Sequence, residues 1–187
     1  MLGGFALQRG DRPVDLPPAC QRMIALVAAK QRPVHRLWVC AMLWPHAQTR
    51  RATASLRSAM WRLRPVGAEA LLVVDPQYVA LSPEVRVDLH EARDHIECLL
   101  DHSEPAGADP TLIAELLPLL RAGDLLDGWD EAWVVRERDA YRATRAAALD
   151  LLGRNSDKQV PHYSRTSRHS VHPLRPVAPA NNDPGEP

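Results

Sequence analysis

The most informative segment for the fold is RRATASLRSAMWRLR, residues 50–64. Its apolar residues recur at the spacing of one helix face, and they are Ala52, Leu56, Ala59, Met60 and Leu63. The opposite face is polar and cationic, with Arg50, Arg51, Arg57, Ser58, Trp61, Arg62 and Arg64. Pro65 and Gly67 end the pattern. The stretch therefore predicts an amphipathic helix over 50–64 with five arginines on its exposed side.

The segments around this helix predict an α+β module over residues 1–86. Before it, residues 5–16 predict a short hairpin, and residues 18–30 and 34–44 predict two apolar helices. After it, residues 71–74 and 78–81 predict a second hairpin around the turn Asp75-Pro76-Gln77. Three helices followed by a β-hairpin is the order of a winged helix-turn-helix. In that arrangement the third helix enters the major groove of DNA, and the hairpin, or wing, lies over the backbone or minor groove.

Charge is sorted along the chain, although the total is zero. Residues 1–86 hold 12 basic and 5 acidic side chains, residues 87–152 hold 6 and 15, and residues 153–187 hold 5 and 3. Between Asp15 and Glu69 there are nine Arg or Lys and no acidic residue. Such asymmetry is typical of a nucleic-acid-binding module beside a module with another partner, so neutrality does not exclude DNA.

The second half of the chain predicts an all-α module over residues 87–152. Acidic and apolar periodicity indicates helices over 87–101, 111–121 and 130–152, with a loop at 103–110. From Gly153 the chain has six prolines and only four Ile, Leu, Val, Phe or Met residues. Because such a segment cannot bury enough apolar surface to offset its ordering entropy, residues 153–187 are predicted to be a disordered tail.

Three segments together resemble a known family: LWVCAMLWP at 37–45, RRATASLRSAMWRLR at 50–64 and LLVVDPQYVALSPEVRVDLHEA at 71–92. They look like the Streptomyces antibiotic regulatory protein (SARP) type of bacterial transcriptional activators. The segment at 116–152 is similar to the start of that family's second domain. The resemblance implies an OmpR/PhoB-like winged helix over 1–86, then a truncated, tetratricopeptide-like bacterial transcriptional activator domain over 87–152.

The resemblance also implies a DNA site and its partners. Residues 50–64 would be the recognition helix and Gln77-Tyr78 the wing tip, so the DNA-binding candidates are Arg50, Arg51, Arg57, Ser58, Trp61, Arg62, Arg64, Gln77 and Tyr78. The implied partners are double-stranded promoter DNA, with two copies on direct repeats, and RNA polymerase. The similarity to response regulators covers their output domain only, because no receiver domain with a phospho-accepting Asp precedes it.

The sequence departs from the family at three places. The first strand looks clipped at Met1, the wing turn Asp75-Pro76-Gln77 lacks the basic residue often seen there, and the second domain ends at about Leu152. An arginine-rich helix face is also commonly a solvated face, and Trp61 could be a half-buried packing residue. The alternative to DNA binding is therefore a truncated protein-interaction module that acts through the acidic helices at 87–152 and binds DNA weakly or not at all.

Other function classes have little support in the sequence. No Walker A loop, GxGxxG or GxSxG occurs, so no catalytic residue, cofactor or enzymatic activity is predicted. Cys98 and His102 are four residues apart on a predicted helix, as metal ligands can be, but two ligands make no site. His162, His169 and His172 lie in the predicted disordered tail and could bind metal adventitiously, so no metal site is predicted. Trp129 and Trp133 suggest core packing, with a partner surface as the alternative. The absence of a long apolar run or secretory signal, with three widely spaced cysteines, predicts a cytoplasmic protein without a membrane partner.

Overall fold

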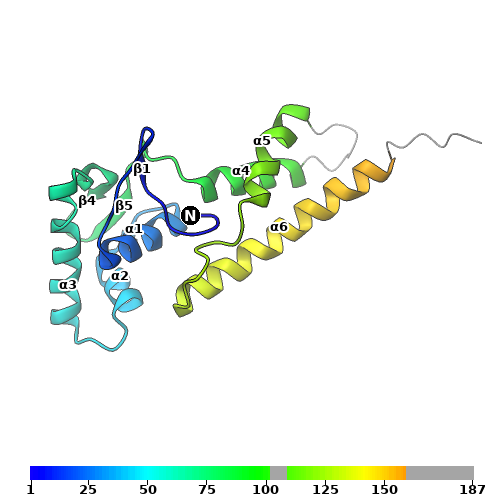
Figure 1. The fold of residues 1–187 in the computed structure, drawn as a ribbon. Coiled ribbons are helices and arrows are strands. Elements are labelled where there is room, and N and C mark those ends of the chain that lie inside the picture. Colours follow the sequence, from blue (N-terminus) through cyan, green and yellow to red (C-terminus); the bar gives the residue numbers. More distant parts are fainter. Residues whose placement is uncertain (102–108, 159–187) are drawn as a thin grey trace, which may run out of the picture.

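The computed structural model describes residues 1–101 and 109–158, which form an α+β fold (Figure 1). Within these residues there are six α-helices and two small antiparallel sheets, so the predicted α+β class is confirmed at this level. Almost all of the predicted loop at 103–110 and the predicted tail beyond Lys158 lie outside the described residues.

The first region is built from three packed helices and a three-stranded sheet. The helices are α1 (Pro18–Lys30), α2 (Arg36–Leu43) and α3 (Thr49–Trp61). The sheet has the order β3-β5-β4, from β3 (Val34–His35), β4 (Leu72–Val74) and β5 (Tyr78–Leu81). A separate hairpin of β1 (Gln8–Arg9) and β2 (Arg12–Pro13) precedes the helices. Both predicted hairpins are confirmed: the first has strands of only two residues each, β4 begins one residue later than predicted, and β5 spans the predicted residues 78–81.

Helix α1 is the centre of this region because its middle turns are buried on every side. Its residues from Met23 to Ala29 are all buried, and it contacts α2, α3 and β5. Pro18 occupies the first turn, where a missing backbone N–H costs nothing. The helix ends at Gln31, which adopts the left-handed conformation with φ 51°. A helix of this composition forms a core against which an amphipathic neighbour such as α3 can dock.

Two predicted helix boundaries in this region were wrong. Val34 and His35 are strand, because they pair with Val79 and Tyr78 in the antiparallel ladder of β3 and β5. Helix α3 ends at Trp61 rather than at residue 64, and Arg64 belongs to a short 3-10 turn, Arg64–Val66. Pro65 accounts for the second error, because proline cannot donate the hydrogen bond that would continue the α-helix.

The second region consists of α4 (Asp88–Asp101), α5 (Pro110–Arg121) and α6 (Ala132–Lys158). Helix α4 packs against both α5 and α6. Helix α6 continues six residues past its predicted end at Leu152, so the predicted start of the disordered tail at Gly153 was wrong. A single glycine inside a helix costs about 1 kcal/mol relative to alanine, which a helix of this length tolerates.

The two regions share one continuous hydrophobic core. The N-terminal residues tie them further: the amino group of Met1 pairs with Asp88 at 2.6 Å, and Leu2 forms a β-bridge with Leu125. Gly3 is required at this crossing, because its φ is 75° and a Cβ there would lie 2.4 Å from the carbonyl oxygen of Ala122. The α1–α3 region and the α4–α6 region therefore form one packed body.

Candidate nucleic-acid interface

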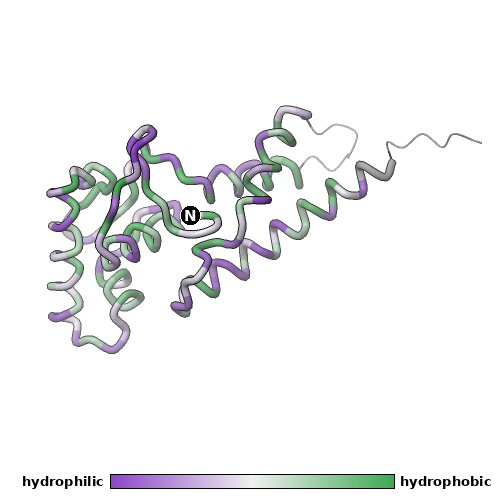
Figure 2. Tube along the Cα trace, in the orientation of Figure 1, coloured by the Kyte–Doolittle hydropathy of each residue, from purple (hydrophilic) through white to green (hydrophobic). Residues whose placement is uncertain are grey.

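Helix α3 presents one exposed stripe to solvent at the edge of the molecule (Figure 1). The stripe consists of Arg50, Ala54, Arg57 and Trp61, spaced by four, three and four residues, which places them in line along the helix. Trp61 is 64% exposed, so it does not pack in the core. Arg51 and Ser58 are exposed on the flank of the same stripe. Figure 2 shows hydrophilic and hydrophobic residues interspersed along α3, as expected for a helix with one buried side.

The other side of α3 holds it against the core. Ala52, Leu56 and Ala59 are buried, and Met60 packs partly against the same cluster. The Cys20 thiol of α1 donates to the carbonyl oxygen of Ala59 at 3.3 Å. Burial raises the pKa of that thiol, which keeps it protonated as the donor. Helix α3 is thus fixed along its apolar side and leaves its cationic side uncovered.

The arginines of this surface are not neutralised. Among the described residues, Arg50, Arg51, Arg57, Arg62 and Arg64 take part in no ion pair. All five side chains are exposed. A guanidinium keeps its charge at any physiological pH and can bind phosphate or the guanine edge in a bidentate manner. This surface is therefore suited to a polyanionic partner.

Arg62 and Arg64 lie beyond the α-helix rather than along it. Arg62 is the C-terminal cap of α3, with its N–H bonded to the carbonyl oxygen of Ser58 at 3.1 Å. Arg64 follows in the 3-10 turn. The sequence prediction placed both on the helix face with Arg57, whereas the structure places them past the end of the stripe.

The tip of the β4–β5 hairpin exposes Gln77 and Tyr78 and is tightly ordered by Asp75. The Asp75 carboxylate accepts hydrogen bonds from the backbone N–H of Tyr78 at 2.6 Å and of Gln77 at 2.7 Å. These two bonds, Tyr78 first, lower the pKa of Asp75 below its ordinary value. The Tyr78 ring contacts His35 edge-on, with the ring centroids 5.4 Å apart. The predicted tip residues are thus presented on a fixed turn.

Arg36 is a candidate that the sequence reasoning missed. It opens α2, and its guanidinium donates to the carbonyl oxygens of Asp75 at 3.2 Å and Pro76 at 3.4 Å. Its backbone N–H also bonds the carbonyl oxygen of Gln77 at 2.8 Å. The hairpin turn lacks a basic residue in its own sequence, and Arg36 supplies one from a position 39 residues earlier. No local pattern in the sequence signals a contact of that separation.

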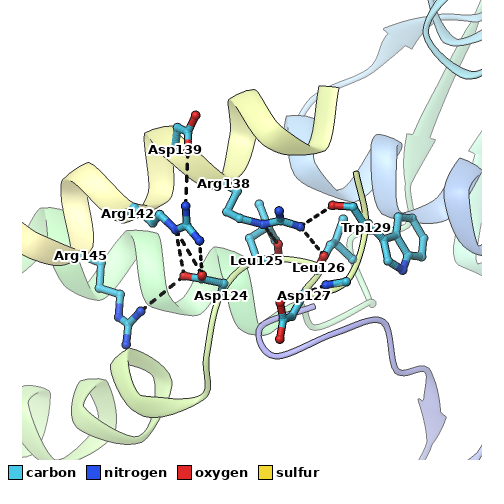
Figure 3. A network of polar contacts seen from close by, with 10 residues as sticks. Asp124, Leu125, Leu126, Asp127, Trp129, Arg138, Asp139, Arg142 and Arg145 are labelled. Atoms are coloured by element: carbon cyan, nitrogen blue, oxygen red, sulfur yellow. Dashed lines mark hydrogen bonds and ion pairs between the residues drawn. The ribbon is translucent and has the colours of Figure 1, made fainter. Parts of the chain in front are cut away.

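Arginines of the second region have a different environment, shown in Figure 3. Arg138 of α6 donates to the carbonyl oxygens of Leu125 at 2.8 Å, Leu126 at 2.5 Å and Trp129 at 2.7 Å. Asp124 accepts from Arg142 and pairs with Arg145 at 3.6 Å. The hydrogen bond from Arg142 is the main cause of a lowered pKa of Asp124. These side chains hold the connection between α5 and α6 in place.

The remaining candidates do not assemble into a site. Trp133 is 4% exposed and packs edge-on against Trp129, which fits the core-packing interpretation. Cys98 is exposed on α4, while His102, His162, His169 and His172 lie outside the described residues. Residues 1–101 and 109–158 contain no group of three potential metal ligands. None of the helices in that part of the chain is long and apolar enough to cross a membrane.

No family model matches this chain, and no curated protein matches it. The features that point to a function are the exposed side of α3, the β4–β5 hairpin and the residues around them.

Proposed function

We propose that this protein is a DNA-binding transcriptional regulator that inserts α3 in the major groove of promoter DNA. The observation that carries the proposal is the exposed stripe of α3. Its arginines have no ion-pair partner within residues 1–101 and 109–158, and they project from a helix that is buried on its other side. An α-helix fits the major groove, and arginine is the side chain that most often reads guanine there.

The arrangement of the first region supports a winged-helix assignment. Helices α1, α2 and α3 are followed by the β4–β5 hairpin, and β3 joins that hairpin to the segment between α1 and α2. In our proposal α3 is the recognition helix and the hairpin is the wing. The SARP-type family and a tetratricopeptide-like character of α4–α6 are part of the same proposal, on the sequence resemblance alone.

Each exposed residue has a role that its chemistry suits. Arg57, near the middle of the stripe, is the candidate for bidentate bonding to guanine, which contributes about 1–3 kcal/mol of discrimination per base. Arg50 and Arg51, at the start of α3, would neutralise phosphates, and so would Arg62 and Arg64 past its end. Trp61 offers an apolar face for a sugar or a thymine methyl group. Gln77, Tyr78 and Arg36 would meet the backbone beside the wing.

The second region is proposed to face other partners. Residues 87–152 carry a net charge of −9, which repels DNA and restricts contact to the cationic region. We assign RNA polymerase as the partner of this region, with two copies of the protein on direct repeats, in the cytoplasm and without enzymatic activity. These assignments follow the resemblance and are testable separately from DNA binding.

The experiment is a binding titration across salt concentrations. A duplex is selected from a random library with the full chain, and its affinity is measured by fluorescence anisotropy at several potassium chloride concentrations. We expect a steep linear fall of log affinity with log salt, because each neutralised phosphate releases counterions. We also expect the selected duplex to outcompete unrelated duplex. Failure to enrich any sequence, or an affinity that salt does not change, would contradict the proposal.

One observation favours the interaction-module alternative as a second candidate. Leu100 of α4 and Leu149 of α6 are 39% and 43% exposed, so the second region presents apolar side chains to solvent. Under this alternative, DNA binding disappears at physiological salt with competitor DNA. A protein partner would then be recovered through residues 87–152, and substitution of Leu100 and Leu149 by Ser would abolish its capture.

A further inference from the structure

A cleft lies where the first region meets α6. It has a volume of about 330 Å³. Six residues line it: Lys30 of α1, Trp38 and Met42 of α2, and Trp133, Arg136 and Glu137 of α6. None of them belongs to the candidate DNA interface. The volume lies at the lower end of the range found for small-molecule sites, which is roughly 300–1,000 Å³.

The charge balance of this cleft favours an anion. Glu137 is the only acidic residue that lines it, and its carboxylate already pairs with Lys30 and, at 3.2 Å, with Arg93. Arg136 takes part in no ion pair within the described residues, and its guanidinium makes only a 3.9 Å contact with the sulfur of Met42. The Glu137 carboxylate is thus paired with two cations, and the Arg136 guanidinium has no counterion among the described residues.

The rest of the lining consists of two tryptophan side chains and one methionine side chain. Trp38 and Trp133 contribute large flat side chains, and the ammonium of Lys30 lies over the Trp38 ring at 5.4 Å from its centroid. The thioether of Met42 is polarizable and adapts to aromatic neighbours. Trp133 is 4% exposed, yet its indole N–H has no acceptor among the described residues. A buried donor without an acceptor costs free energy.

We propose that this cleft binds a small planar aromatic carboxylate. The aromatic ring packs among Trp38, Met42 and Trp133, and the carboxylate pairs with the guanidinium of Arg136. Such a ligand contacts both α2 and α6, so it bridges the two regions of the molecule. The proposal goes beyond DNA binding and does not depend on it.

The test uses 1-naphthoate as the probe and its neutral isostere 1-naphthamide as the comparison, with the full chain in isothermal titration calorimetry. We expect saturable binding of 1-naphthoate at one site and at least tenfold weaker binding of 1-naphthamide, because a charge-assisted pair to Arg136 is lost. Arg136→Gln is expected to reduce the affinity for 1-naphthoate about tenfold or more and to leave the affinity for 1-naphthamide unchanged. Trp133→Phe replaces the indole by a smaller ring and reduces the aromatic surface of the cleft, so it is expected to weaken the binding of 1-naphthoate several-fold.

Matched controls separate this site from the rest of the molecule. Arg154→Gln removes an exposed arginine from the same helix and should leave 1-naphthoate affinity unchanged. Arg57→Ala should reduce DNA binding and keep 1-naphthoate binding, so failure of one proposal is distinguishable from failure of the other. Circular dichroism shows whether each variant is folded. If Trp133→Phe unfolds, the affinity of Arg136→Gln for 1-naphthoate alone tests the proposal. Absence of saturable binding, equal affinity for 1-naphthamide, or an unchanged affinity of Arg136→Gln would overturn the proposal.

Discussion

The arginines at α3 differ in their environment from most of the arginines in the α4–α6 region. At α3 and just past it, five exposed arginines have no ion-pair partner among the described residues. In the second region Arg93, Arg138, Arg142 and Arg145 are all engaged, with carboxylates or with backbone carbonyls. An arginine that has no partner within the fold is available to bind another molecule. An arginine that bonds carboxylates or carbonyl oxygens of the fold contributes to stability instead. The comparison therefore separates binding arginines from structural ones.

The largest expected effect is on stability, at Arg138. Arg138→Met keeps the apolar stem and leaves three carbonyl oxygens without their donor. Because hydrogen bonds to a charged group are worth about 1.5–3 kcal/mol, we expect the free energy of unfolding to fall by about 3 kcal/mol. Urea denaturation measures it. The control Arg154→Met should change stability by less than about 0.5 kcal/mol. Equal stability of the Arg138 variant would mean that the network in Figure 3 is not structural.

The next effect is on DNA affinity, at Arg57. Arg57→Ala should weaken binding to the selected duplex by about 1–3 kcal/mol, or roughly 5- to 150-fold, and relax preference at one base. Its free energy of unfolding should stay within about 0.5 kcal/mol of the parent, because the side chain is exposed and unpaired. Anisotropy titration and urea denaturation give the two values. Loss of stability without loss of affinity would place Arg57 among the structural arginines instead.

A smaller effect concerns the salt dependence of binding. Arg50→Gln and Arg51→Gln should each reduce the slope of log affinity against log salt by about 1, because each is assigned to a phosphate. Sequence preference should change little, since phosphate contacts carry no base information. The same anisotropy titrations, repeated on a shuffled duplex, measure both quantities. A slope equal to the parent's would remove these two residues from the interface.

The smallest effect is the pH dependence of the β4–β5 hairpin. The pKa of Asp75 is lowered by hydrogen bonds from Tyr78 and Gln77, so its contribution to stability is present above the ordinary carboxyl pKa of about 3.9. That contribution is lost as pH falls through the lowered value. In an NMR titration we expect the Asp75 carboxyl to titrate below about pH 3.9, together with the two amide protons. A midpoint at or above that value would show that the turn is not fixed by Asp75.

Much of the fold could be predicted because its signals are local. Helix α3 followed from the spacing of Leu56 and its apolar neighbours, and the β4–β5 hairpin followed from a turn sequence between two apolar runs. The errors involved distant partners or helix ends. Val34 and His35 form a strand because they pair with β5. Arg64 lies in a 3-10 turn and not in α3 because Pro65 follows it.

The candidate site could be predicted only in part, because some of its contacts join residues that are far apart in the sequence. The exposed arginines of α3 follow from helical periodicity, which needs one segment alone. Arg36 reaches the hairpin turn across 39 residues, and the cleft at Trp133 brings α1 and α2 against α6. Such contacts depend on how elements pack in space, and a single sequence does not record them.

We propose that α3 and the β4–β5 hairpin contact DNA while α4–α6 do not. The most direct measurement is an NMR titration of the isotopically labelled full chain with the selected duplex, following backbone amides and arginine side chains. We expect the largest shifts at Arg50, Arg57, Trp61 and the Gln77–Tyr78 tip, with small shifts over residues 88–101 and 109–152. Large shifts confined to α4–α6, with α3 unchanged, would contradict it.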